Sequence, residues 1–253
     1  MNLISVKIIN QLKDNYSFIL YNDTGEACVI DPAESLPIIE YVKNNSLEIK
    51  DICITHHHKD HTSGIDGILK NFPKVNIYSP SSRIKNTKYV LNDNDEVETH
   101  INSFKVINTP GHTLDHIIFF DNQNKNLFCG DTLFRLGCGR VFEGTLDQMY
   151  SSLQKINELD DNLIVYCGHE YTLTNLNFLE SILDKKKLYS YIRGRIESDL
   201  KLTKKSVPFN LFEEKMYNLF LNQESQIGTL IKKELKLENF SLFKHLREKK
   251  DNF

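Results

Sequence analysis

The seven-residue segment Thr55–His61, THHHKDH, is the feature of the sequence that most restricts its fold. It carries four imidazoles and one carboxylate, and it follows directly on the apolar run Ile52–Ile54. The run is typical of a buried strand, and the segment SGIDGILKNF that comes next has the pattern of a helix. The His-rich segment is therefore predicted to be a loop at the C-terminal end of a strand, where binding sites commonly gather.

The same local setting recurs three times further along the chain. His112 in NTPGHT, Asp131 in LFCGDT and His169 in VYCGHE each follow a glycine at the end of an apolar, strand-like run. Four strand-end loops thus supply seven candidate metal ligands: His56, His58, Asp60, His61, His112, Asp131 and His169. Seven ligands exceed what one tetrahedral ion uses, and they suit two ions that share a carboxylate.

The donor chemistry limits which metal is expected. Imidazole and carboxylate donors without a thiolate favour zinc, iron or manganese over a Cys-rich structural zinc site. Each residue taken alone is better explained as a loop polar group or a hydrogen-bonded buried histidine. The set, placed on successive strand ends, favours a metal centre.

The chain changes character near residue 170. Before that point short β-like runs alternate with turn signals, and YNDTGE at 21–26 reads as a hairpin turn. Helices are predicted at 34–45 and at 145–159, where Thr145 and Gln148 have capping-box spacing. After residue 170 amphipathic helical patterns take over. We therefore predict an α/β sandwich domain at 1–170 and a helical domain at 171–253.

Composition excludes several classes of function. The formal net charge of −3 argues against nucleic acid held by a broad electrostatic field. Five scattered cysteines are odd in number and favour a reducing compartment over a disulfide framework. No apolar run approaches the roughly 18 residues that a membrane span needs. We expect a cytoplasmic monomer that binds neither nucleic acid nor membrane.

The ligand pattern resembles that of the metallo-β-lactamase superfamily, in which H-x-H-x-D-H is followed by a later His, Asp and His. The resemblance implies an α+β fold, an αββα sandwich with the metals at one edge of its two sheets. It further implies that His56, His58 and His112 bind one metal and that Asp60, His61 and His169 bind the other. Asp131 would bridge the two ions.

Within that superfamily the chain resembles the glyoxalase II family. The resemblance rests on GDTLFRLGCGRVFEGT at 130–145, CGHEYT at 167–172, the C-terminal helical region and the ending LREKKDNF. It implies that the helical domain and nearby loops hold the glutathione part of a thioester. The residues implied as glutathione contacts are Arg140, Tyr171, Arg247 and Lys250. Without the resemblance, Arg247 and Lys250 would be read as a solvated helix end.

Three positions depart from the pattern expected of that family. Arg140 stands where Lys is frequent, Phe142 stands where Tyr is frequent, and Asp115 stands where Gly is expected. The first keeps the charge but alters its reach. The second removes one hydroxyl contact to glutathione. The third has no explanation in the sequence.

The resemblance implies hydrolysis of S-D-lactoylglutathione to D-lactate and glutathione, the second step of methylglyoxal detoxification. Two divalent ions, with zinc expected and iron or manganese as alternatives, would supply a bridging hydroxide at neutral pH. Asp60 would orient that hydroxide, and Asp131 would hold both ions, so these two aspartates are the predicted catalytic residues. A thiolate leaves without strong acid help, so no separate general acid is expected.

Four other functions were weighed against this one. A glutathione persulfide dioxygenase shares the H-x-H-x-D-H run but uses a single iron, and the helical C-terminal region with LREKKDNF argues against it. Many β-lactamases of the superfamily place Cys where Asp131 stands. A nuclease would be expected to carry a basic surface. A non-catalytic binding module has no evident reason to keep all seven ligands.

Overall fold

The computed structural model describes residues 4–183 and 186–253, and they form two compact units. The first unit comprises the chain up to Asn108 together with Asp115–Gly130. The second unit comprises Thr109–Leu114 and Asp131–Phe253.

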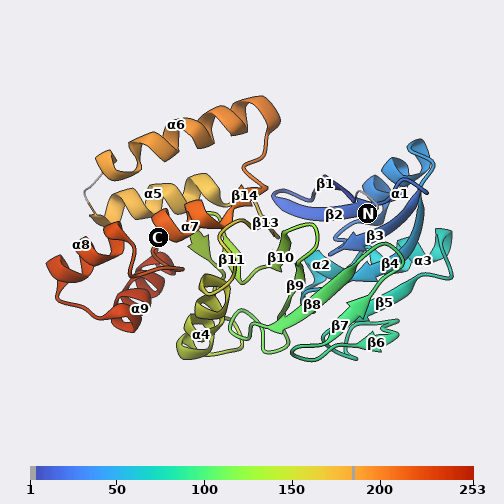
Figure 1. Cartoon of the computed structure of the whole chain (residues 1–253), viewed down its shortest axis with the longest axis horizontal. Helices are drawn as coiled ribbons and strands as arrows, with labels where there is room; N and C mark the ends of the chain where they lie inside the picture. Colours follow the sequence, from blue (N-terminus) through green and yellow to red (C-terminus); the bar gives the residue numbers. More distant parts are fainter. Residues whose placement is uncertain (1–3, 184–185) are drawn as a thin grey trace. The chain divides into compact units, whose positions relative to one another are not determined.

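The first unit contains a six-stranded sheet in the order β1-β2-β3-β4-β5-β6 (Figure 1). Its strands are β1 (Ser5–Gln11), β2 (Asn15–Tyr21), β3 (Glu26–Ile30), β4 (Glu48–Cys53), β5 (Asn76–Ser79) and β6 (Tyr89–Val90). Strands β1, β2 and β3 pair antiparallel, whereas β3, β4, β5 and β6 run parallel. Because β3 and β4 are parallel neighbours, their C-terminal ends meet at one edge of the sheet.

Four antiparallel strands of a second sheet also belong to the first unit. They are β7 (Glu96–Glu98), β8 (Ser103–Asn108), β9 (Ile117–Asp121) and β10 (Asn126–Gly130). Aromatic rings join the two sheets: Phe18 on β2 lies 5.5 Å from Phe128 on β10, centroid to centroid. Phe128 in turn meets Phe104 on β8 edge to face at 6.1 Å. The first unit is thus a sandwich of two sheets with an aromatic interior.

Helices α1 (Ser35–Asn44) and α3 (Ile65–Asn71) pack on one face of the six-stranded sheet, and the single turn α2 (Lys59–Thr62) follows β4. Ile38 and Val42 of α1 and Ile68 of α3 are fully buried in one apolar cluster with strand residues such as Val29 and Ile52. Burial of each such side chain stabilises the fold by about 1.5–3 kcal/mol. The cluster fixes the strand β4 from which the His-rich segment emerges.

The second unit is mainly helical. Its helices are α4 (Leu146–Asn157), α5 (Thr172–Leu183), α6 (Lys186–Thr203), α7 (Leu211–Tyr217), α8 (Gln226–Leu235) and α9 (Asn239–Lys250). A small hairpin joins β11 (Leu133–Phe134) to β12 (Gly137–Cys138), and β13 (Ile164–Cys167) pairs antiparallel with β14 (Phe209–Asn210). Helix α4 begins at Thr145 with both hydrogen bonds of the predicted capping box.

Most local predictions are confirmed. The segment 21–26 turns between the antiparallel strands β2 and β3, and the predicted helix at 34–45 is α1. One prediction was wrong in part, because the short strand β14 lies in the C-terminal region that was expected to be helical. A two-residue strand leaves no periodic pattern for the sequence to reveal. Within residues 4–183 and 186–253, no helix combines the length and apolarity that crossing a membrane requires.

Candidate metal centre

The His-rich segment leaves the end of β4, as predicted, but it is not a loop throughout. Helix α2 begins at Lys59, so Asp60 and His61 lie on its single turn. His56 is fully buried and His61 is 1% exposed, whereas His58 and Asp60 are half-buried. The helical turn brings Asp60 and His61 back beside the residues that precede it.

Asp31, at the end of the neighbouring strand β3, orients this segment. Its carboxylate accepts hydrogen bonds from the backbone N–H of Thr55 at 2.8 Å and from Thr55 Oγ1 at 2.7 Å. The same carboxylate lies 3.0 Å from His61 Nδ1. A carboxylate on Nδ1 fixes the ring and directs Nε2 as the ligand atom, a common arrangement around metal-binding histidines.

Sequence reasoning missed Asp31. The available signal was VIDP, a carboxylate directly after an apolar run, which is the setting of Asp131 without the preceding glycine. Asp31 is 1% exposed and adopts a positive φ of 50°. Such a conformation is uncommon outside glycine, which indicates that the surrounding contacts hold it in place.

Asp60 and His56 are oriented by other first-unit residues. Asn15 Nδ2 donates to Asp60 Oδ2 at 3.0 Å and to the Asp60 carbonyl at 3.2 Å. Thr55 Oγ1 lies 3.0 Å from His56 Nδ1, and the buried ring of His116 stacks on His56 at 4.8 Å. His56, like His61, therefore presents its Nε2 side away from the residues that hold it.

A glycine at the end of β10 is required by this packing. Gly130 has a φ of +46°, and a Cβ there would lie 2.5 Å from Thr55 Oγ1 and 2.8 Å from His116 Nε2. No real side chain tolerates such distances. The glycine before Asp131 therefore permits the close approach of Thr55 and His116.

In the second unit, two candidate ligands, both histidines, flank the carboxylate of the third. Asp131 Oδ2 lies 3.3 Å from His112 Nε2 and 3.3 Å from His169 Nε2. All three side chains are at most 6% exposed. The Nδ1 atom of His112 lies 2.8 Å from the carbonyl oxygen of Arg140, which fixes this ring as Asp31 fixes His61. The ring of His169 stacks on Tyr171 with a centroid separation of 4.8 Å.

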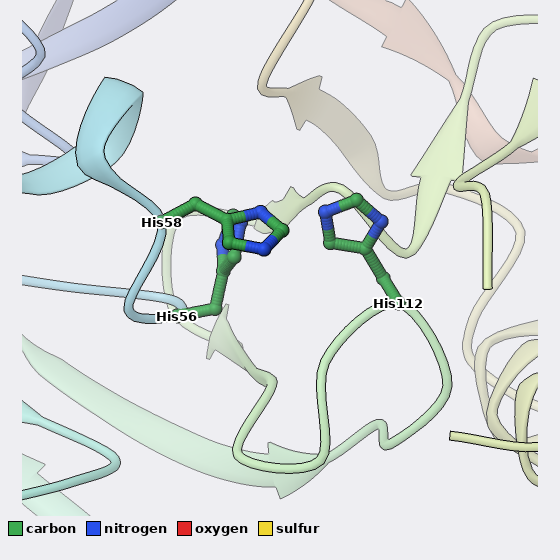
Figure 2. Close-up of side chains that lie close together, drawn as sticks. All are labelled: His56, His58 and His112. Atoms are coloured by element: carbon green, nitrogen blue, oxygen red, sulfur yellow. The ribbon is translucent and has the colours of Figure 1, made fainter. Parts of the chain in front are cut away.

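Ligand atoms gather in three overlapping groups, in each of which all atoms lie within 4.8 Å of one another. The groups are His56, His58 and His112; His56, His61 and Asp131; and Asp60, His61 and His169. Figure 2 shows the first group, in which the three imidazoles point toward one another. Every residue in the groups offers an imidazole nitrogen or a carboxylate oxygen, the donors that first-row divalent metals accept. The residues present thus fit divalent metal ions.

A contact with His57 explains why an aspartate stands at position 115, where the family pattern predicts glycine. His57 Nδ1 lies 2.9 Å from Asp115 Oδ1, and both side chains are largely buried, at 24% and 15% exposed. Asp115 therefore holds His57, which lies between the candidate ligands His56 and His58. A glycine at position 115 could not supply this contact.

The residues predicted to contact glutathione lie in two settings. Arg140 is exposed, with Nε 3.5 Å from Asp251 Oδ1 and its guanidinium over the ring of Phe142. Tyr171 is half-buried between His169 and Phe134. Both side chains belong to the segments that carry the candidate metal ligands of the second unit.

Arg247 and Lys250 lie on the last turn of α9. Arg247 is 4% exposed and donates to the Cys138 carbonyl at 3.1 Å and to Asp251 at 2.8 Å. Lys250 donates to the Thr174 carbonyl and lies 4.9 Å over the ring of Phe178. Burial, reinforced by the nearby Arg247 charge, lowers the pKa of Lys250 to about 8. Sequence reasoning missed Asp251, which forms ion pairs with Arg140 and Arg247.

Comparison with known proteins separates the families that share this geometry. The model of the metallo-β-lactamase superfamily matches residues 13–169, and that of the hydroxyacylglutathione hydrolase C-terminus matches residues 170–253. The hydroxyacylglutathione hydrolase of Pectobacterium atrosepticum is 40% identical over 257 residues, which cover all of both chains. This chain belongs to the hydroxyacylglutathione hydrolase family. The resemblance inferred from the sequence is confirmed.

Solved structures extend the comparison to the wider superfamily. The BLEG-1 B3 metallo-β-lactamase is 26% identical and has a TM-score of 0.60, covering 65% of this chain and 91% of that one. ETHE1 from Myxococcus xanthus has a TM-score of 0.66 at 23% identity, with 95% of each chain covered, which shows a common fold alone. The predicted α+β metallo-β-lactamase fold with a C-terminal helical region is thereby confirmed for this member of the hydroxyacylglutathione hydrolase family.

Proposed function

We propose that this protein hydrolyses S-D-lactoylglutathione to D-lactate and glutathione with the help of two divalent metal ions. The observation that carries the proposal is the overlap of the ligand groups. His56 belongs to two of the three groups and His61 to two, so the groups are immediate neighbours. Asp131 shares its group with both of these histidines, which supports its proposed role as the bridging carboxylate.

The donor set supports zinc as the proposed metal, with iron or manganese as alternatives, because it contains imidazole and carboxylate but no thiolate. One ion would be held by His56, His58 and His112, and the other by Asp60, His61 and His169. When bound, the two ions would supply a water of lowered pKa and polarise the thioester carbonyl.

The chain's own groups orient the reactants. Asp60 is the proposed acceptor for the hydrogen of the attacking water, and Asn15 holds its carboxylate in one orientation. His58 and Asp60 are half-buried, whereas His56 and His61 are buried, so the first two are the more accessible to a substrate. A thiolate is a good leaving group, and no side chain is assigned as its acid.

The proposed glutathione contacts are cations and one aromatic hydroxyl. Glutathione has free carboxylates, which Arg140 and Lys250 would bind through charge-assisted hydrogen bonds. Tyr171 would add a hydroxyl beside His169. The proposed contact of Arg247 uses the part of its guanidinium that is not engaged by Cys138 and Asp251.

The cellular role follows from the reaction. Hydrolysis of S-D-lactoylglutathione is the second step of methylglyoxal detoxification, and we propose that role here. All five cysteines lie in the described part of the chain and are buried thiols, which supports a reducing compartment such as the cytoplasm. The monomeric state and the domain boundary at residue 170 stay predictions.

Hydrolysis of S-D-lactoylglutathione by the purified protein, with metal analysis of the same sample, tests the proposal. We expect release of free thiol together with about two metal ions per chain. Oxygen consumption with glutathione persulfide, in the absence of thioester hydrolysis, would instead identify a dioxygenase. The relatives that match this chain over their whole length are named hydroxyacylglutathione hydrolases, and this favours the first outcome.

A further inference from the structure

The hairpin of β11 and β12 is held by side chains from three helices of the second unit. Its tip is formed by Arg135 and Leu136, and Leu136 adopts a positive φ of 60°. Leu136 is fully buried, and Phe134 and Cys138 are 5% exposed. The backbone N–H and C=O groups of such a buried tip need partners other than water.

Helix α7 and the residue that caps it supply most of these partners. Glu214 accepts a hydrogen bond from the Leu136 N–H at 2.8 Å. Asn218 Nδ2 donates to the carbonyls of Phe134 at 3.2 Å and Gly137 at 3.0 Å, and also to Glu214 at 2.9 Å. Glu214 and Asn218 are both 0% exposed.

Two further helices complete the contacts. Asn175 of α5 donates from Nδ2 to the Arg135 carbonyl at 3.0 Å. Arg247 of α9 donates to the Cys138 carbonyl at 3.1 Å. The backbone of residues 134–138 is therefore bonded to side chains from α5, α7 and α9. We call Asn175, Glu214, Asn218 and Arg247 the hairpin clamp.

Burying the polar side chains of the clamp costs free energy, which indicates that they do more than fill space. A fully buried carboxylate loses its hydration, and apolar side chains could fill the same volume at lower cost. The clamp instead places acceptors and donors at the positions of the hairpin's backbone groups. It specifies the path of one short segment.

In the sequence, the hairpin lies between Asp131, a proposed ligand, and Arg140, a residue that orients another proposed ligand. Asp131 precedes the hairpin, and Arg140, whose carbonyl fixes the ring of His112 at 2.8 Å, follows it. The two ends are joined, because the Gly139 N–H donates to the Thr132 carbonyl at 3.2 Å. A Cβ on Gly139 would lie 1.9 Å from the Asp131 carbonyl oxygen, so the returning chain passes directly against Asp131.

We propose that Glu214 and Asn218 are positioning residues that hold two metal ligands, Asp131 and His112, through the β11–β12 hairpin. The inference rests on the proposed function, since it assigns these ligands a shared metal centre. Neither residue touches the ligands or a substrate. Their effect passes through the backbone from the hairpin tip to Asp131 on one side and to the Arg140 carbonyl on the other.

The decisive variants are Asn218→Leu, which removes the two donor bonds to the hairpin, and Glu214→Gln, which keeps an acceptor oxygen for Leu136. The matched control is Gln223→Leu. Gln223 is 1% exposed and bonds to the Leu219 and Phe220 carbonyls of the same unit, but it does not contact the hairpin. If Asn218→Leu does not fold, the smaller change Asn218→Ala takes its place.

Three measurements are made on each full-length protein. Chelator competition gives the zinc dissociation constant, thermal unfolding gives the loss of stability, and amide hydrogen exchange of the metal-free protein reports on residues 131–140. For Asn218→Leu we expect faster exchange in this segment and a dissociation constant raised roughly 10- to 100-fold. Glu214→Gln should retain most of the wild-type affinity, and Gln223→Leu should lower the melting temperature with unchanged affinity.

Equal zinc affinity in Asn218→Leu and Gln223→Leu, at similar loss of stability, would overturn the inference. A wild-type protein that binds no metal would overturn the proposed function instead. In that case the exchange of residues 131–140 still decides whether the clamp holds the hairpin, and unchanged exchange in Asn218→Leu would overturn the clamp itself.

Discussion

In the first unit, four of the proposed ligands come from the six consecutive residues His56–His61, whereas in the second unit the other three come from three separate segments. The first group is oriented by side chains that lie close to it, above all Asp31 on the neighbouring strand and Asn15. Among the candidate ligands of the second unit, His112 is oriented by the backbone carbonyl of Arg140. The β11–β12 hairpin lies between Asp131 and Arg140 in the sequence. The four proposed ligands of the first unit are thus close in sequence, whereas the three of the second unit come together only through the tertiary structure.

This difference predicts how each half responds to mutation. Loss of Asp31 should disturb the ligands it contacts directly. Loss of a clamp residue should act over a longer path and should be accompanied by greater mobility of residues 131–140.

Asp131→Asn should have the largest effect, because it replaces the proposed bridging carboxylate. Metal content should fall, and turnover should drop by more than the roughly 10- to 100-fold typical of a residue outside the ligand set. The control is Asp121→Asn, a fully buried aspartate that bonds to Asn102 and Asn124 instead. Full activity of Asp131→Asn with two bound metals would refute the bridging role of Asp131.

Glu214→Gln should change the pH dependence of stability in the second unit. Burial raises the pKa of Glu214 to about 7, against the opposing effects of the Leu136 N–H, Arg135 and Asn218, with Glu213 adding to the rise. The folded protein therefore keeps a proton that the unfolded chain releases, and this group's contribution to stability falls as pH rises from about 4.5 to about 7.

Urea unfolding of the metal-free wild type and of Glu214→Gln at pH 5 and pH 8 measures that effect. The wild type should lose stability relative to the variant by at most about 3 kcal/mol. Identical pH dependence in the two proteins would show that Glu214 does not titrate in this range.

Asp31→Asn sharpens the comparison from the side of the first unit. The amide can still accept the Thr55 N–H, but its NH2 group cannot accept a hydrogen from His61 Nδ1, so the ring loses its fixed orientation. We expect metal affinity to fall roughly 10- to 100-fold in chelator competition. Asp51→Asn is the matched control, since Asp51 is also fully buried and contacts the Nδ1 of a histidine, His100. A similar loss in both variants would contradict a specific role for Asp31.

Lys250→Ala should have the smallest effect, a rise in KM of about tenfold with kcat little changed, because its contact is equally strong in ground and transition states. With a pKa of about 8, the amine loses its charge above that pH, so the KM of the wild type should also rise there. Lys244→Ala, on the exposed face of the same helix, should behave as wild type. A large fall in kcat at constant KM would refute the assignment.

The sequence identified the ligand candidates because each stands directly after a strand-like run. THHHKDH is dense enough to be recognised alone, and the glycine before His112, Asp131 and His169 marked the others. The structure explains one of these glycines, since any side chain at Gly130 would collide with Thr55 and His116. Local pattern and local packing agree at these positions.

What the sequence could not show are partners that lie far apart along the chain. Asp31 stands 30 residues from His61, and Glu214 stands 78 residues from Leu136. Neither has a motif of its own, because its role depends on which strand or helix folds against it. Asp115 is similar: it was unexplained in the sequence, and only the fold shows that it meets His57.

Our main proposal is that two neighbouring metal ions work together in the three ligand groups, the first of which Figure 2 shows. Titration of the metal-free protein with zinc, followed by the rate of S-D-lactoylglutathione hydrolysis, tests it most directly. Activity should rise until two equivalents of zinc are bound and then level off. Full activity at one equivalent, or hydrolysis that persists in excess chelator, would contradict it.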